Sequence, residues 1–388
     1  MRRAALLLPA LLAIGCGREP LDLLVPAERD DPCRAFVTQA ECSENAVLGC
    51  SFQPNAEGCL SSDPSCQPGM CRSGDPFVRR VERSFLLNGE PFRFVGVSSW
   101  AMLQPESCAT VKVEERQAWV EQAYDGLVPA RAKVARFFAF QNSAGPNGDD
   151  FSLLDAAIRS ARRAGVRLQL VLDDDDGGCS SGVNHDAAWF AGGYQEPEGA
   201  YTLSYRDYAE SLARRYRDEP TVLGYLLIQG FGAADKATLT NFVNDMGQRL
   251  HGLAPSQLLS IDLAWSGDAA TFSELERLPA VDFMDIDDYN FKYPTVPLDP
   301  VLLNALAELD KPAVVGEGAF VLLGKDAAAL QARADAALQR ASQWRAWGFS
   351  GALFWAYQPG WVEVSAEFDA RPGDPMLRAG GVLASAPW

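Results

Sequence analysis

From about residue 84 onward, short apolar runs alternate with longer amphipathic stretches, a pattern typical of a parallel sheet whose strands are connected by helices. The apolar runs predict eight strands. They are Phe92–Ser98, Val134–Phe140, Arg167–Asp173, Val222–Gln229, Leu258–Ala264, Asp282–Tyr289, Ala313–Glu317 and Gly351–Ala356.

Amphipathic segments lie between most of these strands. The predicted helices are Val113–Gly126, Phe151–Ala164, Tyr201–Asp218, Thr238–Leu253, Asp299–Leu309 and Asp326–Trp347, with a shorter segment around Phe272–Leu278. Alternating strands and helices in this number predict an α/β fold, a (β/α)8 TIM barrel. In such barrels the active site lies at the carboxyl ends of the strands, so residues that end a predicted strand are the first candidates for chemistry.

The chain is acidic. It has 51 Asp and Glu against 34 Lys and Arg among its 388 residues, a formal net charge of −17. A surface of that sign repels phosphate backbones and anionic membranes, so nucleic acid is not expected as a partner.

The first residues have the two regions of a signal peptide, Met-Arg-Arg followed by an apolar run that ends at Ile14. That run is too short for a membrane span, which needs about 20 residues. It leads into Leu12-Ala-Ile-Gly-Cys16, which is similar to a bacterial lipobox. We therefore expect a signal peptide over 1–15, a lipid on Cys16 that anchors an exported lipoprotein at the cell envelope or surface, and a tether over 16–32. Ordinary secretion with cleavage nearby is the alternative.

Nine cysteines minus Cys16 leave eight, an even number that suits disulfide pairing in an oxidising compartment. Six of them predict a small cystine-rich module over 33–71, ahead of a barrel over 84–388: Cys33, Cys42, Cys50, Cys59, Cys66 and Cys71. Zinc is the competing interpretation of this module, but the sequence has no CxxC pair and no nearby His there. Cys108 and Cys179 each follow a predicted strand and are expected to form a disulfide between two loops.

Several stretches of the predicted barrel occur in a recognisable order. They include Phe85-Leu-Leu-Asn-Gly-Glu-Pro-Phe-Arg-Phe-Val-Gly, Val134-Ala-Arg136-Phe-Phe-Ala-Phe, Leu212-Ala-Arg-Arg-Tyr-Arg-Asp-Glu-Pro-Thr-Val-Leu-Gly, Lys311-Pro-Ala-Val-Val-Gly-Glu317-Gly and Gly348-Phe-Ser-Gly-Ala-Leu-Phe-Trp355. Together they resemble glycoside hydrolase family 5, most closely its endo-β-1,4-mannanase (mannan endo-1,4-beta-mannosidase) branch. The resemblance covers most of residues 84–357.

The resemblance implies a retaining hydrolysis that uses two carboxyl groups. It gives Glu317, at the end of a buried strand, the position of the nucleophile. Arg136 and the Tyr289 hydroxyl are the expected partners that keep this carboxylate ionised, and Trp355 offers a flat apolar face on which a sugar ring can stack. Gln229 replaces an Asn of the family and joins Arg136, Tyr289 and Trp355 as a predicted substrate-binding residue.

The acid/base position departs from the family pattern, because Gly230 stands where the family has Glu. Asp287, which replaces a family His, is the candidate for a substitute acid. Other carboxylates are expected near the mouth of the barrel: Asp262, Asp285, Asp288 and the run Asp173–Asp176. We interpret that run as a solvated loop rather than a calcium site.

The chain has two histidines, His185 and His251, and both are expected at the surface. No metal and no cofactor is predicted. Three functions stay open: a hydrolase of β-1,4-linked, mannan-like polysaccharide, a non-catalytic pseudoglycosidase that binds such a polysaccharide or oligosaccharide, and an interaction protein that uses its cystine module.

Overall fold

The structure is a computed structural model that describes residues 50–54, 69–73, 76–99, 120, 123–145, 147–175, 177, 180–199, 201–230, 234–262, 269–290, 298–358 and 367–378. The predicted signal peptide, the tether, Cys16, Cys108, Cys179 and most of the helix predicted over 113–126 lie outside these residues. Within the described part of the chain, no helix has both the length and the apolar character that crossing a bilayer requires.

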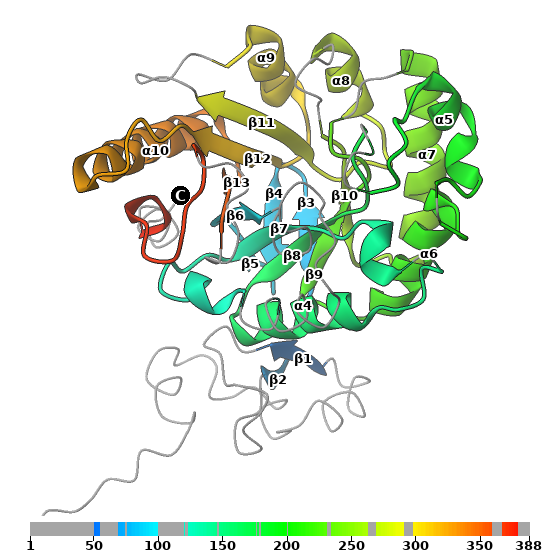
Figure 1. The fold of residues 1–388 in the computed structure, drawn as a ribbon, viewed down its shortest axis with the longest axis horizontal. Helices are drawn as coiled ribbons and strands as arrows, with labels where there is room; N and C mark the ends of the chain where they lie inside the picture. The colour runs from blue at the N-terminus through cyan, green and yellow to red at the C-terminus, as the bar shows by residue number, and fades with distance from the viewer. Residues whose placement is uncertain are drawn as a thin grey trace, which may run out of the picture.

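Eight parallel strands form a barrel, as Figure 1 shows. They are β6 (Phe94–Ser99), β7 (Val134–Phe138), β8 (Arg167–Val171), β9 (Val222–Leu226), β10 (Leu258–Ser260), β11 (Met284–Asn290), β12 (Ala313–Phe320) and β13 (Gly351–Trp355). Each strand pairs with its neighbours in the order β10-β9-β8-β7-β6-β13-β12-β11, and a bridge between Asp262 and Asp285 closes the ring. The predicted TIM barrel and its eight strands are therefore confirmed.

Helices form the outer layer around these strands (Figure 1). They are α4 (Ser152–Arg163), α5 (Ala187–Ala191), α6 (Tyr205–Tyr216), α7 (Lys236–Leu253), α8 (Ala269–Leu275), α9 (Pro300–Glu308) and α10 (Ala327–Trp347), with short 3-10 helices η4 (Asp125–Leu127), η5 (Gln141–Ala144) and η6 (Gly193–Gln195). Several begin where the sequence supplies an N-cap, because the side chains of Ser204, Asp235 and Asp326 each accept a hydrogen bond from a backbone N–H of the first turn. The short helix α5 was not predicted.

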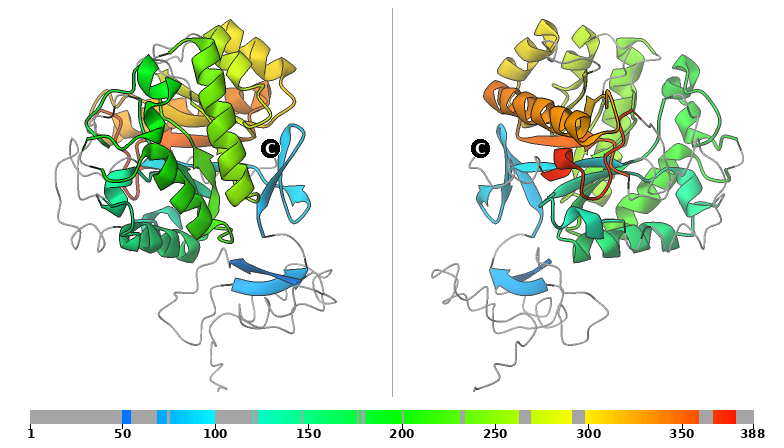
Figure 2. Two further views of the ribbon diagram at one scale, coloured as in Figure 1. Left: turned by 90° about the vertical axis from the view of Figure 1, so that its right-hand side faces the viewer. Right: turned by 60° about the vertical axis from the view of Figure 1, so that its left-hand side comes forward.

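Two small antiparallel sheets precede the barrel. One pairs β1 (Cys50–Pro54) with β2 (Gly69–Ser73), and the other joins β3 (Val78–Val81), β4 (Ser84–Leu87) and β5 (Glu90–Pro91). The second sheet lies at one end of the barrel (Figure 2), where Val78 and Phe85 pack with apolar side chains from the starts of the barrel strands. This sheet closes the amino-terminal end of the barrel, and it begins ahead of residue 84.

The surroundings of Gly96 in β6 show how tightly the barrel strands pack. A Cβ atom at this position would lie 1.8 Å from the carbonyl oxygen of Val134 in the neighbouring strand β7. Because the obstructing atom belongs to the backbone, we expect Gly96→Ala to lower the free energy of unfolding by about 1–3 kcal/mol or more. Denaturant titration of the full chain measures this change.

Gly252 near the end of α7 is the matched control, since a Cβ there has no atom within 4 Å. Gly252→Ala is expected to be neutral or to stabilise the protein by up to about 1 kcal/mol, because Ala favours the helix more than Gly does. Equal stability of Gly96→Ala and the parent chain would contradict the close packing of β6 on β7.

Candidate active site

A buried polar layer crosses the barrel interior, and Arg136 of β7 lies at its centre. Arg136 stands beside Ser98 of β6 and Gln169 of β8 in the sheet register. The other buried members of the layer are Ser260, Asp262, Asp285 and Glu317. Alternate residues of a strand face opposite sides of the sheet, so one inward residue from each of several strands builds this layer.

Arg136 has no exposed surface and is surrounded by four carboxylates. Its Nη2 atom lies 2.7 Å from Oδ1 of Asp285. Its Nη1 atom lies 3.5 Å from Asp262, 3.7 Å from Asp287 and 3.6 Å from Glu317. Burial opposes the charge of the guanidinium, but the four carboxylates outweigh burial and raise the pKa of Arg136. Arg136 is therefore the fixed positive charge of the site.

Glu317 lies in β12 and is 3% exposed. The Tyr289 hydroxyl donates a hydrogen bond of 2.5 Å to Oε2, and the Ser98 hydroxyl donates one of 3.4 Å to Oε1. Burial raises the pKa of Glu317, whereas Arg136 and the hydrogen bond from Tyr289 oppose that rise because they stabilise the carboxylate. The structure thus brings Arg136 and Tyr289 onto Glu317, and their side chains fix the direction of this carboxylate.

Asp287 of β11 stands directly opposite Glu317 in the sheet register, and its side chain is 19% exposed. Its Oδ2 atom accepts a hydrogen bond of 3.2 Å from Nε2 of Gln229, whereas Oδ1 has no hydrogen-bond donor among the described residues. Burial raises the pKa of Asp287 well above its ordinary value, and the neighbouring charges of Asp262 and Glu317 add to the rise. The surroundings of Asp287 therefore favour the protonated form of its carboxyl group more than those of an ordinary Asp.

Gln229 links Arg136 to Asp287 through hydrogen bonds of its side-chain amide. Its Oε1 atom accepts a hydrogen bond of 2.9 Å from Arg136, while its Nε2 atom donates to Asp287. The Gln229 amide thus bridges Arg136 and Asp287. The sequence predicted Gln229 only as a substrate-binding residue and did not indicate this bridging role.

Gly230 has a left-handed backbone with φ of +80°. A Cβ atom at this position would lie 3.0 Å from Oδ1 of Asp175, a residue of the predicted acidic loop. The Asp175 amide also donates a hydrogen bond of 3.0 Å to the carbonyl of Gln229. Asp175 therefore places its carboxyl group beside Gly230, and the sequence did not distinguish it from the rest of its acidic run.

Trp355 is half-buried at the end of β13, and its ring packs edge-on against Phe138 with the centroids 6.2 Å apart. Trp355 packs against a cluster formed by Phe138, Phe140, Val171 and Leu226. This cluster lies toward the carboxyl ends of β7, β8 and β9. The tryptophan therefore borders the mouth of the barrel.

Asp288 points away from the site, unlike its neighbours Asp287 and Tyr289. Its carboxylate pairs with Arg340 at 2.6 Å and accepts a hydrogen bond of 2.6 Å from Nε1 of Trp344, both from the outer helix α10. The expectation that the Asp288 carboxylate lies at the mouth of the barrel is wrong, because the alternation of side chains along β11 directs it outward.

Gln169 belongs to the site although the sequence analysis missed it. It accepts a hydrogen bond of 3.3 Å from Arg136 and donates to Asp285 at 2.6 Å. The sequence does contain a signal for Gln169, because it is a polar residue between two leucines in the middle of β8.

The acidic run and His185 are also placed differently from the prediction. Asp173 and Asp174 are buried, and His185 has no exposed surface, with its ring stacked on Trp189 at a centroid distance of 3.9 Å. The interpretations of a solvated acidic loop and of a surface His185 are wrong at these positions. Asp176 lies outside the described residues.

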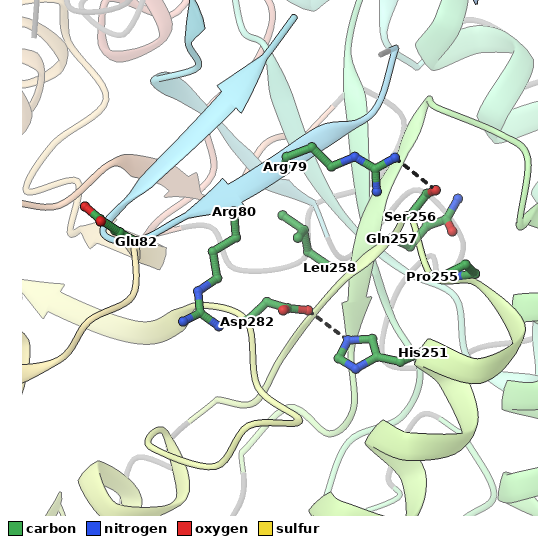
Figure 3. Close-up of a pocket in the computed structure, with 9 residues that line it drawn as sticks. All are labelled: Arg79, Arg80, Glu82, His251, Pro255, Ser256, Gln257, Leu258 and Asp282. Carbon is green, nitrogen blue, oxygen red and sulfur yellow. Dashed lines mark hydrogen bonds and ion pairs between the residues drawn. The ribbon is translucent and has the colours of Figure 1, made fainter. Parts of the chain in front are cut away.

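A cavity of about 400 Å³ lies at the opposite end of the barrel (Figure 3). Its lining includes Leu258 at the start of β10, Asp282 ahead of β11, and Arg79 and Arg80 of β3. His251 lines it as well and contacts Asp282 at 2.9 Å. Because these residues stand at the amino-terminal ends of the strands, this cavity is separate from the candidate active site.

Arg136→Met tests the central charge. Without the guanidinium, the buried carboxylates lose their compensating cation, so we expect a loss of about 3–5 kcal/mol in the free energy of unfolding at neutral pH. A missing cation raises the pKa values of these carboxyl groups in the folded state, and such groups contribute stability that is present at low pH and lost as pH rises. The loss should therefore shrink at mildly acidic pH, as measured by denaturant titration at both pH values.

The matched control is Arg340→Met, which removes a buried arginine that pairs with Asp288. Because Asp288 is a single carboxylate, this variant should show a weaker dependence on pH. Equal pH dependence of the two variants would contradict the four-carboxylate description of Arg136.

Comparison with known proteins adds to this geometry. No model of a protein family matches the chain. Putative mannan endo-1,4-beta-mannosidase 4 of Arabidopsis thaliana is 26% identical over 212 residues, which are 48% of this chain and 51% of the relative. The chain therefore spans about half the length of this curated relative.

Solved structures give the same fold over a larger part of the chain. The endo-1,4-beta-mannanase from Rhizomucor miehei has a TM-score of 0.58 at 14% identity, covering 80% of this chain and 99% of its own. A glycoside hydrolase family 5 mannosidase from the same organism, a mutant in complex with mannosyl-fructose, has a TM-score of 0.55 at 15% identity, covering 80% and 96%. This chain is thus a (β/α)8 barrel with the fold of the glycoside hydrolase family 5 mannanases and a sequence similar to plant mannan endo-1,4-beta-mannosidases.

Proposed function

We propose that the protein is a retaining glycoside hydrolase of β-1,4-linked mannan, with Glu317 as its nucleophile. The observation that carries this proposal is the environment of Glu317, a buried carboxylate beside Arg136 that accepts a hydrogen bond from Tyr289. These contacts oppose the effect of burial and favour the ionised form. The mannanase names of the relatives and of the fold neighbours support mannan as the substrate class.

Asp287 is the proposed proton donor. Its pKa is raised by burial and by neighbouring carboxylates, so it holds a proton at a pH where an ordinary Asp is ionised. Asp287 stands opposite Glu317 in the sheet register. Two neighbouring carboxyl groups whose surroundings shift their pKa values differently can serve as acid and nucleophile. Retaining enzymes hold their two carboxyl groups about 5–5.5 Å apart. Asp175 beside Gly230 is a second carboxyl group for the same role.

The reaction runs in two steps. In the first, an oxygen of Glu317 attacks the anomeric carbon, the glycosidic bond breaks with its electron pair on the leaving oxygen, and that oxygen takes the proton of Asp287. In the second, water attacks the anomeric carbon of the glycosyl ester, gives a proton to the Asp287 carboxylate and releases Glu317. Arg136 and Tyr289 hold the attacking carboxylate in place through both steps.

The remaining predicted residues have binding roles in this proposal. Trp355 at the mouth offers an apolar face for a sugar ring. Gln229 keeps Asp287 oriented through its amide hydrogen. Export and a lipid anchor at Cys16 complete the proposal, which would give the enzyme access to polysaccharide outside the cell.

A non-catalytic pseudoglycosidase is the second candidate function, and Gly230 is the observation that favours it. A glycine with φ of +80° leaves the acid/base position without any side chain. In this alternative the mouth binds a β-linked oligosaccharide, and the buried carboxylates only stabilise the barrel. The third hypothesis, an interaction protein that uses its cystine module, stays a prediction.

Sugar release from mannan and glucan by the full chain tests the proposal. We expect release from mannan, its abolition in Glu317→Ala, and a decrease of about 10²–10⁴-fold in kcat for Asp287→Asn. The decrease should be much smaller for an aryl mannoside with a good leaving group, because such a group departs without a proton. Asp175→Asn is the control. If Asp175→Asn lost activity while Asp287→Asn kept it, the proton donor would be Asp175.

Mannan binding without sugar release by the parent chain would establish the pseudoglycosidase instead. Gly230→Glu is a poor restoration of the acid, because position 230 has φ of +80° and its Cβ would approach Asp175 to 3.0 Å. The Gly230→Glu, Asp175→Gly double variant removes the close contact with the Asp175 side chain. It is therefore the better variant for restoring a glutamate at position 230.

The pH profile gives an independent test. Asp287 must be protonated for the first step, so kcat should fall as pH rises through its raised pKa. Glu317 must be ionised, so kcat should also fall at low pH. Because the two carboxyl groups interact, the measured values belong to the pair. Asp287→Asn should remove the decrease at high pH, and persistence of that decrease would contradict its assignment as the acid.

A further inference from the structure

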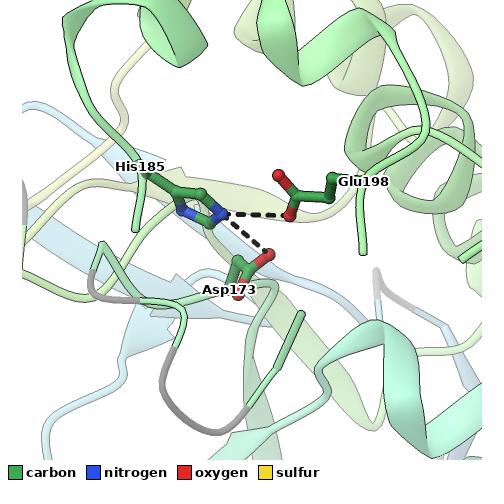
Figure 4. Close-up of side chains that lie close together, drawn as sticks. All are labelled: Asp173, His185 and Glu198. Atoms are coloured by element: carbon green, nitrogen blue, oxygen red, sulfur yellow. Dashed lines mark hydrogen bonds and ion pairs between the residues drawn. The ribbon is translucent and has the colours of Figure 1, made fainter. Parts of the chain in front are cut away.

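A group of three side chains converges outside the catalytic layer (Figure 4). Asp173 follows β8, and His185 and Glu198 belong to the long connection between β8 and α6. Nε2 of His185 lies 3.1 Å from Oε1 of Glu198 and 4.0 Å from Oδ2 of Asp173. One potential ligand atom from each side chain lies within 4.8 Å of the other two.

The surroundings hold each of these side chains in its orientation. Oε2 of Glu198 accepts a hydrogen bond of 2.7 Å from the indole of Trp189, and Oδ1 of Asp173 accepts one of 2.9 Å from the amide of Asp174. The same Trp189 ring stacks on the imidazole of His185. The other oxygen of each carboxylate is left to face Nε2. Such outer partners are what orient the ligands of metal sites.

The charge of the group is unbalanced in its buried setting. Asp173 is only 3% exposed, and no Lys or Arg among the described residues forms an ion pair with Asp173 or Glu198. A protonated His185 would offset only one of the two negative charges. A divalent cation on neutral imidazole and two carboxylates gives zero net charge.

We propose that Asp173, His185 and Glu198 bind a divalent metal ion. One imidazole nitrogen and two carboxylate oxygens suit an ion of the zinc class better than calcium or magnesium, which prefer oxygen alone. Water completes the coordination. The ion would fasten the connection between β8 and α6, which also carries Asp175 beside Gly230. Its role is to brace one side of the barrel mouth, and this role does not depend on catalysis.

Zinc binding to the tag-free full chain, stripped with a chelator, tests this site. We expect calorimetry to show one site that an excess of calcium does not occupy, and zinc to raise the melting temperature. His185→Gln and Glu198→Gln should each weaken binding at this site by at least about 10-fold, because losing even an outer partner of a ligand typically costs about 10–100-fold in metal affinity. The control is His251→Gln, because His251 contacts a single carboxylate, Asp282, and should bind zinc like the parent.

X-ray absorption on the zinc-loaded parent keeps the test decisive if a variant fails to fold. One imidazole nitrogen and otherwise oxygen ligands are expected. Sulfur ligands would assign the zinc to the cysteines instead and overturn the proposal. The proposal is also overturned if the parent binds no zinc or if His185→Gln binds as much as the parent, since the three side chains are then a plain hydrogen-bonded cluster.

Discussion

The guanidinium of Arg136 is the interaction on which the centre of this barrel depends. Four carboxylates face it, and without this buried cation their charges would be left unpaired in the barrel interior. Asp285 lies nearest to the guanidinium at 2.7 Å, whereas Asp262, Glu317 and Asp287 lie at 3.5, 3.6 and 3.7 Å. Because the last three distances are nearly equal, the strongly raised pKa of Asp287 comes from its burial and from the charges of Asp262 and Glu317. One cation thus holds four carboxyl groups together, and their other neighbours distinguish them.

Strand geometry distributes the acidic residues between structure and site. Along β11, Asp285 and Asp287 face the barrel interior while Asp288 faces α10, where Arg340 and Trp344 bind it. The interior is also layered along the barrel axis. Apolar side chains fill the amino-terminal end under the small sheet of β3, β4 and β5, the polar layer follows, and Trp355 borders the opposite end.

The connection between β8 and α6 adds a second polar centre beside the first. Asp173, Asp174 and Asp175 are consecutive, yet Asp173 turns toward His185 while Asp175 approaches Gly230. Backbone hydrogen bonds between Gln229 and both Asp173 and Asp175 join this segment to the end of β9. A change at the His185 cluster therefore has a short covalent and hydrogen-bonded route to the carboxyl group that stands beside Gly230.

The sequence by itself determined the barrel, because strand and helix periodicities are local properties of the chain. The resemblance to a known family pointed to Glu317, Arg136 and Tyr289, and the structure brings these three side chains together. The sequence did not identify Gln169, Asp175 or Glu198, whose significance comes from side chains far away in the chain, and it expected His185 at the surface. Burial and the direction of a side chain are set by packing between segments. Tertiary structure alone therefore decided which of the many carboxylates lie beside Arg136, beside one another or beside His185.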